Sequence, residues 1–293
     1  VCAVLLRHLG MIDEIAFVHP KDMQDGKVPI SGCDITTDLP YVEGVHLAFD
    51  HHGSELARQG ASGPGHVLDA QARSAARVVY EYFGGAARFP ARWNGMMAAV
   101  DRADSAEFTE EEILRPQGWV LFAFLVDPRT GLGRFDTFRL STQALMSHLI
   151  DLCPEHDIDE ILQDPDVTER VALYHEQGER FTAQLRRCSV VHRNLIVFDS
   201  RDEETIHAGN RFMIYALFPQ QNVSMHVMHG SKRQNTVFAI GRSILNRAPL
   251  PHLGNLCLTY GGGGHANAGT CQVANDQAER IQGELIEKLA VGI

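Results

Sequence analysis

Two aspartates and a histidine pair are the residues of this chain best suited to bind a metal ion. Asp34 and Asp50 each follow an apolar, strand-like run, and His51 and His52 come directly after Asp50. Ligands bind at the carboxyl ends of strands in an open parallel sheet, and carboxylates with imidazoles form a mixed ligand set that suits manganese. A single aspartate at a strand end is as often a turn or capping residue. The adjacent Asp-His-His is harder to explain in that way and predicts a metal site.

Four consecutive glycines near the C-terminus are the second candidate feature. They span 261–264 and are followed by His265. Without a Cβ atom, a glycine backbone can approach a ligand closely and direct its N–H groups toward an anion, and the histidine can donate a hydrogen bond to a phosphate. A run of glycines is also common in flexible turns, so on its own it is weak evidence for a binding site.

Strands alternate with helices in the N-terminal part of the chain. The expected strands cover 14–18, 28–33 and 45–49, and the expected helices cover 70–83 and 94–102. This alternation predicts a mainly parallel sheet with flanking helices, at whose strand ends the aspartates would lie.

The remainder of the chain predicts a helical region and then a second α/β domain. Helix 174–187 is the expected connector. Further strands are expected over 189–198, 212–218, 223–228 and 237–240, and a last helix over 275–289. We therefore predict an α/β protein with an N-terminal domain over 1–115, a helical region and connector over 116–187, and a smaller C-terminal mixed-sheet domain over 188–293.

Composition excludes several other classes of protein. The net charge of −11 over 293 residues disfavours a protein that coats long nucleic acid. The six cysteines form no Cys-x-x-Cys pair, which disfavours a zinc knuckle or a disulfide framework and favours a cytoplasmic location. No apolar run approaches the roughly 20 residues of a membrane helix, and no signal segment is evident.

Taken together, the two motifs resemble the DHH phosphoesterase superfamily with its DHH-associated C-terminal domain, as in nanoRNases and exopolyphosphatase-related proteins. The resemblance rests on Asp50-His51-His52 after a strand and on Gly262-Gly263-Gly264-His265 near the C-terminus, in the same order as in the family. Ala98-Ala99-Val100-Asp101 resembles the fourth motif of the family, and Arg242-Ser243 resembles its basic element. The resemblance covers nearly the whole chain.

The resemblance implies a role for each matching position in the N-terminal domain. Asp34, His51 and Asp101 are implied as metal ligands, and Asp34 would bridge two ions. His52 would lie near the substrate phosphate as a catalytic residue, and Asp50 would orient the site from behind.

In the C-terminal domain, the resemblance implies a grip on the substrate phosphate. The implied binding residues are Arg242, Gly262, Gly263, Gly264 and His265. Two further aspartates, Asp38 and Asp104, nearly duplicate Asp34 and Asp101. We rank them lower because each lies further past its strand or helix.

The implied activity is hydrolysis of short oligonucleotides, linear dinucleotides or nucleotide bisphosphates by water attack at two Mn²⁺ ions, with Mg²⁺ or Co²⁺ as alternatives. Exopolyphosphatase activity and a non-catalytic nucleotide sensor are the other hypotheses. We expect a small phosphorylated substrate, no long duplex nucleic acid and no membrane, and leave a homodimer open. The first motif of the family, an Asp-x-Asp-Gly loop, should precede the helix that opens at Val1, so we expect upstream residues that complete the metal site.

Overall fold

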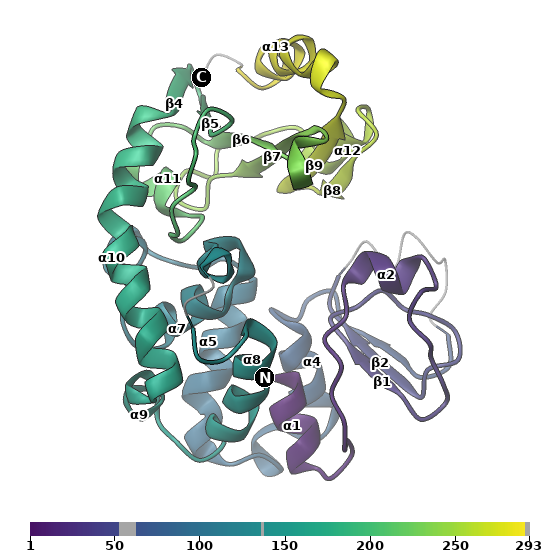
Figure 1. Ribbon diagram of the computed structural model, residues 1–293. Coiled ribbons are helices and arrows are strands. Elements are labelled where there is room, and N and C mark those ends of the chain that lie inside the picture. Colours follow the sequence, from purple (N-terminus) through teal and green to yellow (C-terminus); the bar gives the residue numbers. More distant parts are fainter. Residues whose placement is uncertain (53–62, 136–137, 291–293) are drawn as a thin grey trace. The chain divides into compact units, whose positions relative to one another are not determined.

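The computed structural model describes residues 1–52, 63–135 and 138–290 (Figure 1). The chain forms two compact units. Unit 1 comprises Val1–Glu107, Gln117–Val126 and Asp136–Glu169, and unit 2 comprises Phe108–Pro116, Asp127–Phe135 and Arg170–Ile293. Both units combine helices with a sheet, which confirms the predicted α/β class with two domains.

Unit 1 contains a parallel sheet of three short strands, in the order β1 (Ile35–Thr37), β2 (Leu47–Asp50) and β3 (His66–Leu68). Thr37 pairs with Phe49, so neighbouring strands end at the same edge. The parallel sheet is confirmed, but the strands expected over 14–18 and 28–33 are absent from the described structure. Pro29 and Gly32 interrupt the second of these runs, and 14–18 has no strand partner to stabilise it.

The helices of unit 1 follow from capping residues and apolar faces. The Ser74 hydroxyl accepts a hydrogen bond from the Arg77 amide at 3.0 Å and so begins the predicted helix after it. The α-helices are α1 (Cys2–His8), α2 (Pro20–Gln24), α4 (Ala75–Tyr82), α5 (Asn94–Asp104), α7 (Gly118–Val126), α8 (Thr142–Leu152) and α9 (Ile158–Gln163). The short 3-10 helices of this unit are η1 (Gly85–Ala87) and η2 (Ala91–Trp93).

Unit 2 contains a mixed six-stranded sheet in the order β4-β5-β6-β7-β9-β8. Only β5 and β6 are parallel neighbours. The strands are β4 (Ser189–His192), β5 (Leu195–Asp199), β6 (Val223–His229), β7 (Thr236–Arg242), β8 (Gly263–His265) and β9 (Ala268–Val273). Leu195, Met225 and Phe238 on this sheet and Leu285 on the last helix are fully buried in one core.

Two expectations for unit 2 are wrong in detail. The run 189–198 is a hairpin of two strands, and it turns at Arg193, whose φ is 55°. The run 212–218 contains helix α11 (Met213–Leu217) instead of a strand, because so short an apolar run fits either element.

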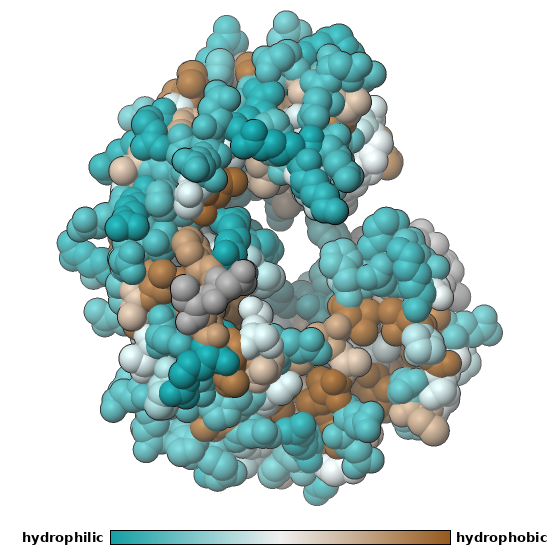
Figure 2. Space-filling model, viewed as in Figure 1, coloured by the Kyte–Doolittle hydropathy of each residue, from teal (hydrophilic) through white to brown (hydrophobic). Residues whose placement is uncertain are grey.

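The other helices of unit 2 are α6 (Glu110–Leu114), α12 (Leu253–Leu258), α13 (Ala278–Leu289) and the 3-10 helices η3 (Pro128–Thr130), η4 (Leu132–Arg134), η5 (Ser231–Arg233) and η6 (Asn275–Gln277). Helix α10 (Pro165–Arg187) begins in unit 1 and continues into unit 2. On the face shown in Figure 2, hydrophilic side chains cover most of unit 2, and hydrophobic surface gathers on unit 1. Among the described residues, no helix has the length and apolar character needed to cross a membrane.

Candidate functional site

The carboxyl edge of the unit 1 sheet places two aspartates on neighbouring strands. Asp38 directly follows β1, and its amide donates to the Phe49 carbonyl at 2.9 Å. Its φ of 58° is a conformation that few residues other than glycine, asparagine and aspartate adopt. Asp50 ends β2 beside it. The sheet therefore brings Asp38 and Asp50 together.

Asp34, in contrast, lies at the other end of β1. The strand begins at Ile35, so the expectation that Asp34 follows a strand is wrong. Its carboxylate accepts hydrogen bonds from the Ser31 amide at 2.7 Å and the Ser31 hydroxyl at 2.9 Å. Asp34 thus closes a local turn, which is the alternative role of a strand-end aspartate.

His51 is held with its Nε2 atom directed at two carboxylates. Its Nδ1 lies 3.2 Å from the Ala72 carbonyl, which can only accept, so Nδ1 carries the proton. Nε2 lies 3.1 Å from Asp104 Oδ2 and 3.7 Å from Asp38 Oδ1. Nε2 is nevertheless buried without a well-formed hydrogen bond to any described residue. A ring fixed in this way is typical of a metal-ligating histidine.

The buried carboxylate of Asp50 orients both histidines through hydrogen bonds. Its Oδ1 accepts hydrogen bonds from the His51 amide at 2.8 Å and from His52 Nδ1 at 2.7 Å. Burial alone would raise the pKa of Asp50, but the bonds from His52 outweigh burial and lower it. The same contact raises the pKa of His52 and fixes which of its two ring nitrogens faces Asp50.

Helix α5 presents Asp104 to this cluster instead of Asp101. Asp101 is buried and accepts hydrogen bonds from the Ser74 hydroxyl at 2.7 Å and from Arg77 at 2.6 and 3.0 Å. These partners fully engage its carboxylate. Asp104 lies one helical turn later, on the adjoining side of the helix, and there its carboxylate reaches His51.

The electrostatics of the cluster favour a bound cation. Burial, and then the charge of Asp104, raise the pKa of Asp38 to about 6. The Asp104 carboxylate beside Nε2 raises the pKa of His51 to about 9 against the opposing effect of burial. Ligand atoms of Asp38, His51 and His52 lie within 4.8 Å of one another. The grouped carboxylate and imidazole atoms, with the buried Nε2 of His51 among them, fit a divalent ion with oxygen and nitrogen ligands.

In unit 2, the glycine run is part of an ordered hairpin and not a flexible turn. Gly263 to His265 form β8, which pairs with β9. A Cβ atom on Gly262 would lie 2.0 Å from the Thr270 carbonyl oxygen, and one on Gly264 would lie 2.2 Å from the Ala268 oxygen. Gly262 and Gly264 are therefore required by packing. A Cβ atom on Gly263 would meet nothing within 4 Å, so of these three glycines only Gly263 has open space beside its Cα atom.

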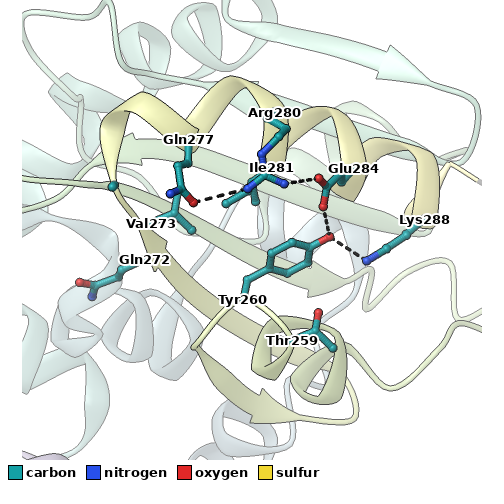
Figure 3. Close-up of a pocket in the computed structure, with 10 residues that line it drawn as sticks. Thr259, Tyr260, Gln272, Val273, Gln277, Arg280, Ile281, Glu284 and Lys288 are labelled. Atoms are coloured by element: carbon teal, nitrogen blue, oxygen red, sulfur yellow. Dashed lines mark hydrogen bonds and ion pairs between the residues drawn. The ribbon is translucent and has the colours of Figure 1, made fainter.

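Tyr260 fixes the start of this run to helix α13. Its hydroxyl donates to Glu284 at 3.0 Å and accepts from Lys288 at 2.7 Å, as Figure 3 shows. These side chains line a polar pocket of about 600 Å³ beside β9. The glycine run therefore follows a residue whose side chain is hydrogen-bonded to helix α13.

Arg242 lies at the end of β7, next to the β8–β9 hairpin. Its amide donates to the Asn267 carbonyl at 2.8 Å, two residues beyond the exposed His265. One guanidinium nitrogen donates to the Leu250 carbonyl at 3.2 Å, and Nε is buried without a partner among the described residues. Sheet pairing thus brings Arg242 close to the hairpin that carries Gly263 and His265.

Comparison with known proteins identifies a close structural relative. A pGpG-specific phosphodiesterase, PggH from Vibrio cholerae, matches with a TM-score of 0.84 and 53% sequence identity over 98% of this chain and 93% of that chain. RecJ of Thermus thermophilus, solved with Mn²⁺, matches with a TM-score of 0.52 and 15% identity over 97% of this chain and 49% of that chain, which shows a shared fold. No family model matches the chain, and neither does any curated protein.

Proposed function

Because the chain belongs to the DHH phosphoesterase superfamily, we propose that it is a metal-dependent phosphodiesterase that hydrolyses linear dinucleotides of the pGpG type. The observation that supports this most directly is the 53% identity to a pGpG-specific phosphodiesterase over 98% of the chain. The cluster around His51 supplies a fitting ligand set, and the hairpin around Gly263 supplies a fitting phosphate contact.

We assign the metal ligands to Asp38, His51 and Asp104, with Mn²⁺ as the preferred ion. Asp38 and Asp104 take the places expected for Asp34 and Asp101, because their carboxylates are the ones directed at Nε2 of His51. A divalent ion would polarise the phosphoryl oxygens and make a water molecule more acidic. Asp50 accepts hydrogen bonds from the His51 amide and the His52 ring, and so fixes the positions of both histidines next to these ligands.

His52 is the residue that we assign to the substrate phosphate in unit 1. Its Nδ1 is engaged by Asp50, so Nε2 is the nitrogen that we assign to the substrate. The carboxylate raises the pKa of His52 through its hydrogen bond to Nδ1, which favours the protonated form of the ring. A protonated Nε2–H donates to an oxygen on which negative charge develops. In unit 2, Arg242, His265 and the Gly263 amide are the proposed phosphate contacts.

Replacing His51 with alanine tests the proposed activity. We expect the variant to lose Mn²⁺-dependent hydrolysis of pGpG by at least about 100-fold, because Nε2 is the proposed nitrogen ligand. Hydrolysis should be measured by chromatography on pGpG, a nucleotide 3′,5′-bisphosphate, cyclic dinucleotides and polyphosphate. A preference for polyphosphate would favour exopolyphosphatase, and binding without any turnover by the wild type would favour a nucleotide sensor.

Metal binding should depend on pH through His51. The raised pKa of about 9 means that, without metal, the ring is protonated at pH 7 and must lose a proton to become a ligand. Apparent Mn²⁺ affinity should rise about tenfold per pH unit up to that pKa. The dependence should be steeper below about pH 6, where Asp38 also binds a proton. Titration calorimetry in buffers of different ionisation enthalpy measures the released proton, and a pH-independent affinity would contradict the assignment.

A further inference from the structure

Arg211 of unit 2 has more hydrogen-bond donors than partners. It precedes α11, and its guanidinium carbon lies 4.1 Å from the centre of the Phe212 ring. Its Nε is 3.4 Å from Asp127 Oδ2, and this nitrogen is buried without a hydrogen-bond partner among the described residues. A guanidinium group carries five N–H donors. Since the side chain is 33% exposed, donors of this group remain accessible to a ligand.

A second guanidinium shares the same carboxylate. Arg129 Nε donates to Asp127 Oδ1 at 2.7 Å, and 62% of the Arg129 side chain is exposed. Two positive charges therefore face one negative charge, in a chain whose net charge is −11. Burial, followed by repulsion from Arg129, lowers the pKa of Arg211, although an arginine remains charged in a protein. This local excess of positive charge would be relieved by an anion.

The backbone around both arginines is held before any ligand arrives. Asn210 is buried, and its side-chain amide donates to the Ile113 carbonyl and to the Tyr174 hydroxyl, each at 3.0 Å. The Gly209 amide donates to the Thr130 carbonyl at 3.0 Å, which joins the two segments that carry the arginines. A rigid frame of this kind lowers the entropy cost of ligand binding.

We propose that Arg211 and Arg129 form a binding site for a phosphomonoester, the terminal phosphate of a nucleotide. A phosphomonoester carries a charge of about −1.5 to −2 near neutral pH and several acceptor oxygens. It therefore gains more from two guanidinium groups than a phosphodiester with a single charge, and the guanidinium fork matches phosphate oxygens with two hydrogen bonds. The choice of a nucleotide rests on the proposed function. The arginine site adds to it a means of distinguishing pGpG from GpG.

The direct test is binding of GMP and of guanosine to the metal-free full chain, measured by calorimetry. The wild type should bind GMP about 10- to 100-fold more tightly than guanosine. Arg211→Gln should remove that difference, and Arg211→Lys should keep part of it. Arg180→Gln is the matched control, because Arg180 is an exposed arginine of α10 that lies 3.5 Å from Glu176, and it should behave as the wild type.

Turnover supplies the second readout. In the Mn²⁺-loaded enzyme, Arg211→Gln should lower kcat/KM for pGpG about 10- to 100-fold. The same variant should change kcat/KM for GpG by no more than about threefold from the wild-type value. If Arg211→Gln does not fold, both measurements should be made on Arg129→Gln, because Arg129 is the more exposed of the two arginines. Equal binding of GMP and guanosine by the wild type, or unchanged selectivity in the arginine variants, overturns the inference. Arginine-dependent GMP binding without pGpG hydrolysis would instead overturn the proposed function alone.

Discussion

Replacing Asp104 with asparagine is expected to lower Mn²⁺-dependent turnover of pGpG by at least about 100-fold while the protein remains folded. The Asp104 carboxylate is 3.1 Å from His51 Nε2, and 35% of the side chain is exposed. An asparagine offers a neutral, weaker oxygen ligand in the same volume. The loss should therefore appear in metal affinity and turnover, measured by Mn²⁺ titration of the activity, and not in the melting temperature.

Asp101→Asn is the matched comparison, since it makes the same chemical change one turn away. Asp101 pairs with Arg77 and Ser74, and 8% of its side chain is exposed. Removing one partner of a fully buried ion pair costs about 3–5 kcal/mol. Arg77 is partly solvated, so we expect about 2–3 kcal/mol here, read from the free energy of unfolding in urea. If Asp101→Asn instead lost Mn²⁺-dependent turnover and kept the wild-type free energy of unfolding, Asp101 would be the metal ligand.

The grouping of Asp50, His51 and His52 is the part of the candidate site that residue types and spacing predict. The three residues are adjacent in sequence, so any strand that ends there places them together. The strand-helix alternation predicted a parallel sheet around that strand, but the neighbouring strand β1 was not among the predicted strands. The family prediction, which needed only the order of two motifs, is confirmed by the close relative.

The choice between neighbouring aspartates could not be made in the same way. Asp34 and Asp38 lie at opposite ends of a strand of three residues, so an error of a few residues in the strand boundary exchanges them. Asp101 and Asp104 lie on one helix, and the difference arises from Arg77, a residue 24 positions upstream that engages Asp101. Such a tertiary partner leaves no periodic signal in the sequence.

The glycine run gives the other large expected effect. Gly263→Ala should raise KM for pGpG at least about tenfold, because the methyl group would occupy the open space above the backbone N–H that we assign to the substrate phosphate. Stability should be unchanged or slightly higher, because the new Cβ meets no atom within 4 Å and alanine is less flexible than glycine. Steady-state kinetics and thermal unfolding measure the two effects.

Alanine substitutions at two other glycines of unit 2 show whether an effect at Gly263 comes from ligand contact or from packing. Gly262→Ala should destabilise the protein by at least about 2 kcal/mol, since its Cβ would lie 2.0 Å from the Thr270 carbonyl oxygen. Gly283→Ala, on helix α13 with open space around it, should gain up to about 1 kcal/mol and keep the wild-type KM. If Gly263→Ala also kept the wild-type KM, the run would serve packing alone, because Gly262 and Gly264 already account for the tight approach of β8 to β9.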